Sequence, residues 1–102
     1  MKTRKGANRV AVLGAGSWGT TLANHLAGRG LAVRLWAFEA EVVASISSSR
    51  ENTVFLPGVR LHPALEACGT FAETLAGVDL ALFVTPSHVA RAILRGARVR
   101  LR

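Results

Sequence analysis

The most constraining feature of this sequence is a glycine-rich hexapeptide at residues 14–19, Gly-Ala-Gly-Ser-Trp-Gly. The run before it, residues 10–13, is short, continuous and apolar, which is typical of a strand buried on both faces of a parallel sheet. From Ser17 to about Arg29, apolar residues recur at helical spacing, and Gly28 and Gly30 mark the end. The hexapeptide is therefore predicted to connect a buried strand tightly to a helix.

The rest of the chain alternates between strand and helix patterns. The predicted elements after the first helix are a strand at 32–37, a helix at 39–47, an extended surface loop at 48–63, a short strand at 65–68, a brief helix capped by Thr70 and Glu73, a strand at 78–84 and a helix from Ser87 to about Arg95. Such alternation requires a parallel sheet with right-handed crossovers. We expect an α/β fold, a Rossmann-type doubly wound parallel sheet, which is incomplete because only about four strands are found.

Each glycine of the hexapeptide has a distinct role in a turn that binds a dinucleotide. Gly14 lets the chain turn sharply, Gly16 removes a side chain that would block a pyrophosphate, and Gly19 lets the helix pack closely on the first strand. The phosphates then meet free amides and the positive end of the helix dipole. The alternative is a purely structural turn. The strand before the motif and the helix after it favour binding, because that context is what the mechanism demands.

The end of the second predicted strand offers two more candidate residues. Glu39 lies about 20 positions after the glycines, where an acid accepts hydrogen bonds from the adenosine ribose. With Glu41 nearby it would repel a 2′-phosphate, which favours NAD over NADP unless Arg34 reaches the same edge. Phe38 could stack on adenine. The alternatives are a helix-dipole role for Glu39 and a core or rim position for Phe38. The candidate cofactor-binding residues are thus Gly14, Ala15, Gly16, Ser17, Trp18, Gly19, Phe38 and Glu39.

Charge and composition narrow the classes of partner. The chain has 102 residues, half of them hydrophobic, and a net charge of +7, so one folded domain is expected. Nine of the 13 basic residues lie near the ends, and we treat 1–8 and 96–102 as basic tails. Nucleic-acid binding through these tails is the least favoured hypothesis, because no aromatic residues are interleaved with them. No stretch is long and apolar enough for a membrane helix.

Neither a disulfide nor a metal site is predicted. Cys68 is the single cysteine and has no metal-ligand spacing around it, so a reducing, cytosolic setting fits best. His25 and His62 lack carboxylate or cysteine partners and are interpreted as structural or solvated. His88 follows the last predicted strand, where it could approach the nicotinamide side of a bound cofactor. No catalytic residue follows from these histidines.

Four blocks of sequence resemble the N-terminal domain of NAD(P)-dependent glycerol-3-phosphate dehydrogenases, across roughly residues 9 to 95. The blocks are residues 12–20, 35–39, 51–58 and 79–88. The third block, Glu-Asn-Thr-Val-Phe-Leu-Pro-Gly, is especially telling, because general dinucleotide-binding rules do not require it. The resemblance implies a nicotinamide cofactor, NAD or NADP, with residues 14–19 on its pyrophosphate and Phe38 against the adenosine. Family variation at the end of strand two leaves the choice of cofactor open.

The resemblance also implies a function for the longer enzyme. The family reduces dihydroxyacetone phosphate to sn-glycerol 3-phosphate, which feeds phospholipid synthesis in the bacterial cytoplasm. Its lysines near substrate, one in a Lys-Gly pair and one in a helical C-terminal domain, have no counterpart here, since the only lysines are Lys2 and Lys5. Residues 98–102 also differ from the family's continuation into a fifth strand, which predicts truncation or a shifted reading frame. We expect residues 1–102 to be a single cofactor-binding domain that is inactive alone, without the C-terminal catalytic domain. The alternative is a non-catalytic nucleotide-sensing or interaction module.

Overall fold

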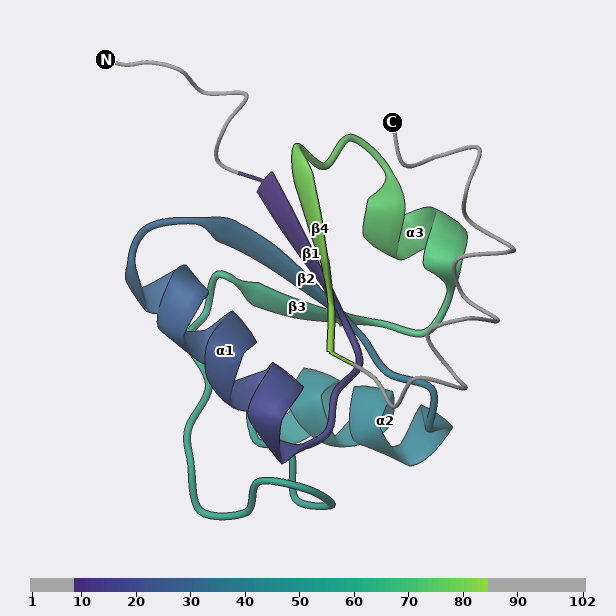
Figure 1. The fold of residues 1–102 in the computed structure, drawn as a ribbon. Helices are drawn as coiled ribbons and strands as arrows, with labels where there is room; N and C mark the ends of the chain where they lie inside the picture. Colours follow the sequence, from purple (N-terminus) through teal and green to yellow (C-terminus); the bar gives the residue numbers. More distant parts are fainter. Residues whose placement is uncertain (1–8, 85–102) are drawn as a thin grey trace.

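The computed structural model describes residues 9–84, and the predicted helix at 87–95, His88 and both basic tails lie outside them. The elements in chain order are β1 (Arg9–Leu13), α1 (Ser17–Gly28), β2 (Ala32–Trp36), α2 (Ala40–Ser49), β3 (Leu65–Cys68), α3 (Phe71–Leu75) and β4 (Leu80–Phe83). Their order matches the alternation predicted from the sequence (Figure 1).

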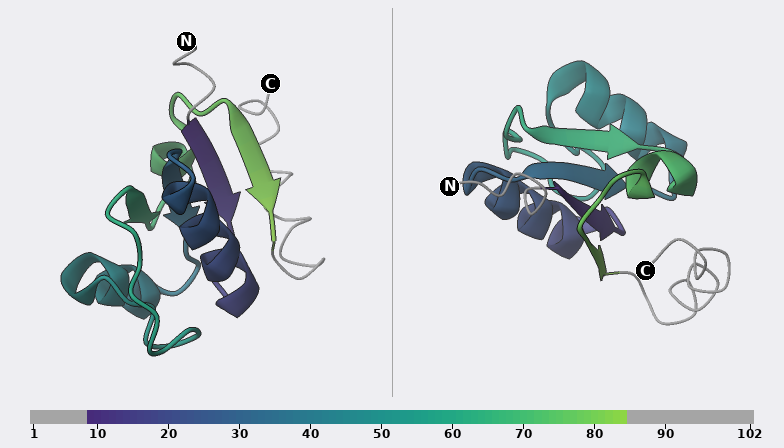
Figure 2. Two further views of the ribbon diagram at one scale, coloured as in Figure 1. Left: turned by 90° about the vertical axis from the view of Figure 1, so that its left-hand side faces the viewer. Right: turned by 90° about the horizontal axis from the view of Figure 1, so that it is seen from above.

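The four strands form one parallel sheet in the order β3-β2-β1-β4. Val12 of β1 pairs with Leu35 of β2 on one side and with Leu82 of β4 on the other. The predicted parallel α/β sheet is therefore confirmed. Figure 2 shows β1 and β4 side by side, with their carboxyl ends pointing the same way.

Helices cover both faces of the sheet, as a doubly wound fold requires (Figure 1). Val10 and Val12 point toward α1 and α2, where they pack with Ala23 and Ile46 in the larger core. The alternate residues of β1 point toward α3 and form a smaller core with Leu75. This explains why β1 is apolar without a break: each of its faces meets a helix layer.

The face that α1 buries differs from the one suggested by its large residues. The buried positions are the small ones, Gly19, Thr20, Ala23 and Ala27, whereas Trp18 is 66% exposed. Small side chains let the helix axis approach the sheet closely, and the bulky side chains then lie at the margin. Trp18 therefore does not anchor the helix in the core.

Several predicted boundaries shift by a few residues. β2 ends at Trp36, α2 spans Ala40–Ser49, and β4 begins only at Leu80. Thr70 caps α3 by accepting a hydrogen bond from the Glu73 amide at 3.2 Å, which confirms that half of the predicted capping pair. Within residues 9–84, no helix has the length and apolar character needed to cross a membrane.

The segment between α2 and β3 is more than a surface loop. Most of it is exposed, but Asn52 is completely buried and Leu61 nearly so. An isolated antiparallel bridge joins Asn52 to Leu56, and the Glu51 carboxylate accepts a hydrogen bond from the Gly58 amide at 2.8 Å. The expectation of an extended loop over the surface is wrong for these positions, because the segment folds on itself and inserts two side chains into the core.

Candidate functional site

The glycine turn lies at the carboxyl end of β1 and leads directly into α1 (Figure 1). Gly14 has a φ of 130°, a conformation that side chains rarely tolerate, and its amide donates to the Trp36 carbonyl at 3.1 Å. Phe38 and Glu39 follow the end of β2, the strand next to β1. The structure therefore brings all the candidate cofactor-binding residues to one edge of the sheet.

The first turn of α1 presents backbone donors without a capping side chain. Gly16 is the N-cap residue, no side chain caps the helix, and the first turn holds no acid. The Thr20 amide bonds to the Gly16 carbonyl at 2.9 Å, so the amides before it have no partner within the helix. Ser17 and Trp18 are exposed beside these amides. Such a helix end attracts an anion through its amides and its dipole.

Two glycines of the turn differ in what surrounds them. A methyl group at Gly16 would meet no atom within 4 Å, so the space above it is open. A methyl group at Gly19 would overlap the carbonyl oxygen of Gly14 and come within 2.7 Å of Val84 Cγ2. Gly19 therefore lets the first turn of α1 lie against Gly14 itself, a tighter fit than packing on β1 alone, while Gly16 leaves room for a ligand.

Phe38 and Glu39 lie shortly after the end of β2. Phe38 is 74% exposed, and its ring meets the edge of Trp36 with centroids 6.0 Å apart. The ring of Trp36 in turn packs against the ring of Phe71, with centroids 5.6 Å apart. Glu39 is the N-cap residue of α2, but its carboxylate caps no amide there. An aromatic face and an acid thus stand beside the turn.

Arg34 does not reach this edge. Its guanidinium donates to the carbonyl oxygens of Glu73, at 3.1 Å, and Ala76, and lies 3.8 Å from the Glu66 carboxylate. These partners sit at the end of α3 and on β3, where the carbonyls of the helix end attract a cation. The suggestion that Arg34 could reach this edge and offset the charges of Glu39 and Glu41 is therefore wrong.

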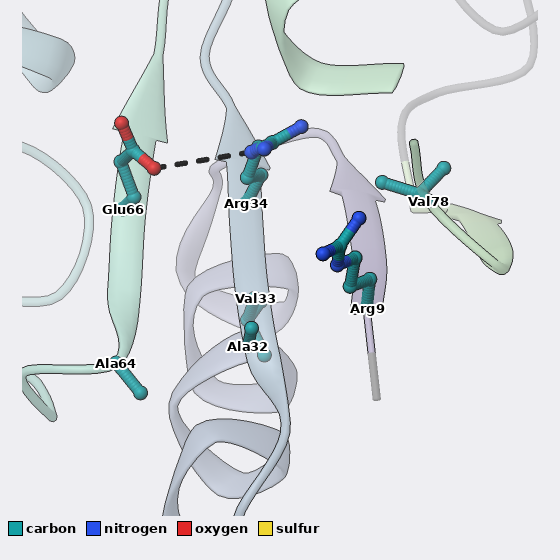
Figure 3. A pocket seen from close by; sticks show the side chains of 7 residues that line it. All are labelled: Arg9, Ala32, Val33, Arg34, Ala64, Glu66 and Val78. Carbon is teal, nitrogen blue, oxygen red and sulfur yellow. Dashed lines mark ion pairs between the residues drawn. The ribbon is translucent and has the colours of Figure 1, made fainter. Parts of the chain in front are cut away.

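A pocket of about 110 Å³ lies at the opposite edge, where the four strands begin. Its lining residues are Arg9, Ala32, Val33, Arg34, Ala64, Glu66 and Val78 (Figure 3). Ligands of open parallel sheets bind beyond the carboxyl ends of the strands. This pocket is therefore on the wrong side for the glycine turn, and the Arg34 guanidinium that lines it already contacts the Glu66 carboxylate and the end of α3.

One residue that contacts the turn escaped the sequence analysis. Asn52 Nδ2 donates to the Ala15 carbonyl at 2.9 Å and to Thr20 Oγ1 at 2.8 Å, and its Oδ1 accepts from the Phe55 amide at 3.0 Å. The Thr20 hydroxyl also donates to the Ala15 carbonyl, at 3.2 Å. The signal was the block at 51–58, which general dinucleotide-binding rules do not require.

Within the part of the chain that the structure describes, Cys68, His25 and His62 have separate surroundings. Burial raises the pKa of the Cys68 thiol above its ordinary value of 9.0, which disfavours the reactive thiolate. His25 is exposed, and His62 Nδ1 accepts from the Ala64 amide at 3.0 Å. In the described range 9–84, no three His, Cys, Asp or Glu residues are grouped to hold a metal ion.

Comparison with known proteins places this geometry in a family. Glycerol-3-phosphate dehydrogenase [NAD(P)+] from Geobacter sulfurreducens is 51% identical over 86 residues, which are 84% of this chain and 26% of the relative. The enzyme from Nitratidesulfovibrio vulgaris strain DP4 is 46% identical over 94 residues, or 92% of this chain and 28% of the relative. The chain thus spans about a quarter of the length of the curated relatives it matches.

Solved structures agree with the sequence relatives. Glycerol-3-phosphate dehydrogenase from Coxiella burnetii superposes with a TM-score of 0.88 and 33% identity, over 95% of this chain and 30% of that chain. The Saccharomyces cerevisiae enzyme gives 0.84 and 26%, over 92% and 30%. The family model described as NAD-dependent glycerol-3-phosphate dehydrogenase N-terminus matches residues 9–101. Nearly the whole chain is matched, and it therefore belongs to the family of NAD-dependent glycerol-3-phosphate dehydrogenase N-terminal domains.

Proposed function

We propose that the glycine turn and the first turn of α1 bind the pyrophosphate of a nicotinamide dinucleotide. The observation that carries this proposal is the uncapped helix end with open space over Gly16. The backbone amides there donate to phosphate oxygens, and the helix dipole favours the negative charge. The proposed partner is the dinucleotide rather than nucleic acid or a membrane, because the cradle is one helix end and not a basic face.

The residues after β2 hold the adenosine part of the cofactor in this proposal. The exposed ring of Phe38 lies against the adenine, and the Glu39 carboxylate accepts hydrogen bonds from the ribose hydroxyls. Glu39 favours NAD over NADP, because its charge repels a 2′-phosphate and Arg34 is engaged at the other end of the sheet. Both cofactors nevertheless fit the names of the relatives.

In the longer enzyme, this chain supplies the cofactor half of the reaction. A hydride passes from the nicotinamide to dihydroxyacetone phosphate and yields sn-glycerol 3-phosphate, a precursor of phospholipids in the cytoplasm. The chain's own lysines are Lys2 and Lys5, and neither matches the family's substrate lysines. Catalysis is therefore assigned to the part of the longer enzyme that carries those lysines.

A nucleotide titration tests the proposal. We expect the purified chain to bind NADH more tightly than NADPH in calorimetry, and turnover of dihydroxyacetone phosphate to require the longer enzyme. Gly16→Ala should weaken the binding of both nucleotides. Gly28→Ala, at the other end of α1, should not, although a methyl group there also meets nothing within 4 Å. Absence of binding of either nucleotide at millimolar concentration would contradict the cofactor site, and turnover by the 102 residues would contradict the division of labour.

A further inference from the structure

We propose that Asn52 is a positioning residue, which fixes the peptide between Ala15 and Gly16 so that the Gly16 amide faces the bound pyrophosphate. The inference rests on the proposed cofactor site. It gives a physical role to the block at 51–58, which the cofactor contacts themselves leave unexplained.

The Ala15 carbonyl is held from inside the fold by two donors. Asn52 Nδ2 reaches it at 2.9 Å and Thr20 Oγ1 at 3.2 Å, and Asn52 and Thr20 are each fully buried. The same Asn52 amide also donates to Thr20 Oγ1 at 2.8 Å. These three groups form a closed triangle of hydrogen bonds beneath the turn, away from solvent.

The geometry of the peptide links the direction of the Ala15 carbonyl to the direction of the Gly16 amide. The described residues contain no cis peptide bond, and in a trans peptide the carbonyl and the amide point in opposite directions. Because the Ala15 carbonyl points into the core, the amide of Gly16 points the opposite way, out of the core. A flipped peptide would present an oxygen to the phosphates and leave two buried donors without an acceptor.

Asparagine suits this place because it carries two donors and an acceptor on one short side chain. Its Nδ2 hydrogens serve the Ala15 carbonyl and Thr20 Oγ1, while Oδ1 accepts from the Phe55 amide at 3.0 Å and so holds the loop. A carboxylate cannot donate, and an apolar side chain can neither donate nor accept. The Glu51 contact to Gly58, at 2.8 Å, closes the loop around the asparagine.

The test compares two probes on the 15N-labelled chain by amide-shift titration. ADP-ribose contains the pyrophosphate, and adenosine lacks it, so their affinity ratio isolates the phosphate contacts. Asn52→Leu removes both donors, and Thr20→Val removes the hydroxyl while keeping its shape. Thr20→Ser retains the hydroxyl as the rescue variant. Thr74→Val is the matched control, since Thr74 is equally buried but donates to the Thr70 carbonyl in α3.

We expect Asn52→Leu to lower the affinity for ADP-ribose by about tenfold and Thr20→Val to lower it by about threefold. The affinity for adenosine should change by less than about twofold. Thr20→Ser should restore the ADP-ribose affinity, and the Gly16 amide signal should shift only in the Asn52 and Thr20 variants that lose hydrogen bonds. Thr74→Val should lower the unfolding temperature without changing the affinity ratio.

Two results would overturn the positioning role: equal weakening of both probes, or an unchanged ADP-ribose affinity in Thr20→Val and Asn52→Leu. If the unaltered chain binds neither ADP-ribose nor NADH, the cofactor site itself fails. That outcome is distinct, because it is read on the unaltered chain before any variant is compared.

Discussion

The two ends of the parallel strands differ in how their polar groups are used. At the carboxyl end, the amides of the first turn of α1 lack a capping side chain, and Trp18 and Phe38 stand exposed beside them. At the amino end, Arg34 is bound to the carbonyls that end α3 and lies beside Glu66, and the Arg9 amide donates to Asp79 at 3.1 Å. The first turn of α1 thus has amides without a capping side chain, whereas the Arg34 guanidinium at the other end already has acceptors within the chain.

This difference shows that a concentration of arginines is a poor guide to an anion site. Two arginines line the pocket at the amino end, yet the Arg34 guanidinium donates to carbonyls at the end of α3 and lies beside the Glu66 carboxylate of the chain itself. The carboxyl end carries no arginine or lysine in its turn, but the amides of the first turn of α1 lack a capping side chain and the space over Gly16 is open.

Gly19→Ala should have the largest effect on stability. The added methyl group overlaps the Gly14 carbonyl and crowds Val84, so we expect a loss of about 3 kcal/mol in the free energy of unfolding. Gly28→Ala is the control in the same helix, and it should be neutral or slightly stabilising. Urea unfolding measures both, and equal stabilities for the two variants would contradict the close packing of the turn.

Gly16→Ala should separate binding from folding at the carboxyl end. Its backbone angles suit any residue and its surroundings are open, so stability should stay within about 0.5 kcal/mol. NADH affinity should fall by about thirtyfold, or ~2 kcal/mol, because the methyl group takes the place of the phosphates. Calorimetry on the folded variant checks this, and unchanged affinity would remove the pyrophosphate from this position.

Arg34→Gln, at the amino end of the strands, should lower stability without lowering NADH affinity, the opposite of Gly16→Ala. Its lost hydrogen bonds to the end of α3 should cost about 1 kcal/mol, since the side chain is partly exposed and its ion pair with Glu66 is screened. NADH affinity should not change. Glu66→Gln, which removes only the ion pair, should cost less than about 0.5 kcal/mol. A large loss of NADH affinity in Arg34→Gln would place the arginine in the binding site after all.

Phe38→Ala tests the exposed aromatic at the carboxyl end. We expect NADH affinity to fall about fivefold through lost stacking, with little change in stability because the ring is 74% exposed. Leu80→Ala is the control from the amino end, where that side chain is 53% exposed. Fluorescence titration compares the two, and an equal effect of both substitutions would argue against contact with the adenine.

Cys68 provides a pH test at the carboxyl end of β3. Because burial raises the pKa of the folded thiol, the unfolded chain ionises first as the pH passes 9.0, and stability is lost as pH rises toward the folded pKa. Cys68→Ala should lack this part of the decline. Urea unfolding from about pH 8 to about pH 10 measures the slope. The same slope in both proteins would show that folding does not change the pKa of the thiol.

Local patterns in the sequence account for the order of elements and for most of the candidate site. The apolar run of β1, the glycines at 14 and 16 and the acid at 39 each follow from rules that act within a few residues. Glu39 and Phe38 could be assigned to the same edge as the turn because the carboxyl ends of neighbouring parallel strands meet there. Helix and strand ends were less well predicted, because capping and pairing compete over one or two residues.

The tertiary structure alone decided which distant groups meet. Nothing periodic in the sequence indicates that Asn52 bonds to Ala15, 37 positions away, or that Arg34 points to α3 instead of the cofactor edge. It also decided that α1 buries its small face, because that choice depends on how closely the helix approaches Gly14. The sequence by itself determined a strand, a glycine turn and a helix, since these depend on local sterics. The fold determined the contacts that hold the turn in place, since hydrogen bonds between distant segments leave no local pattern.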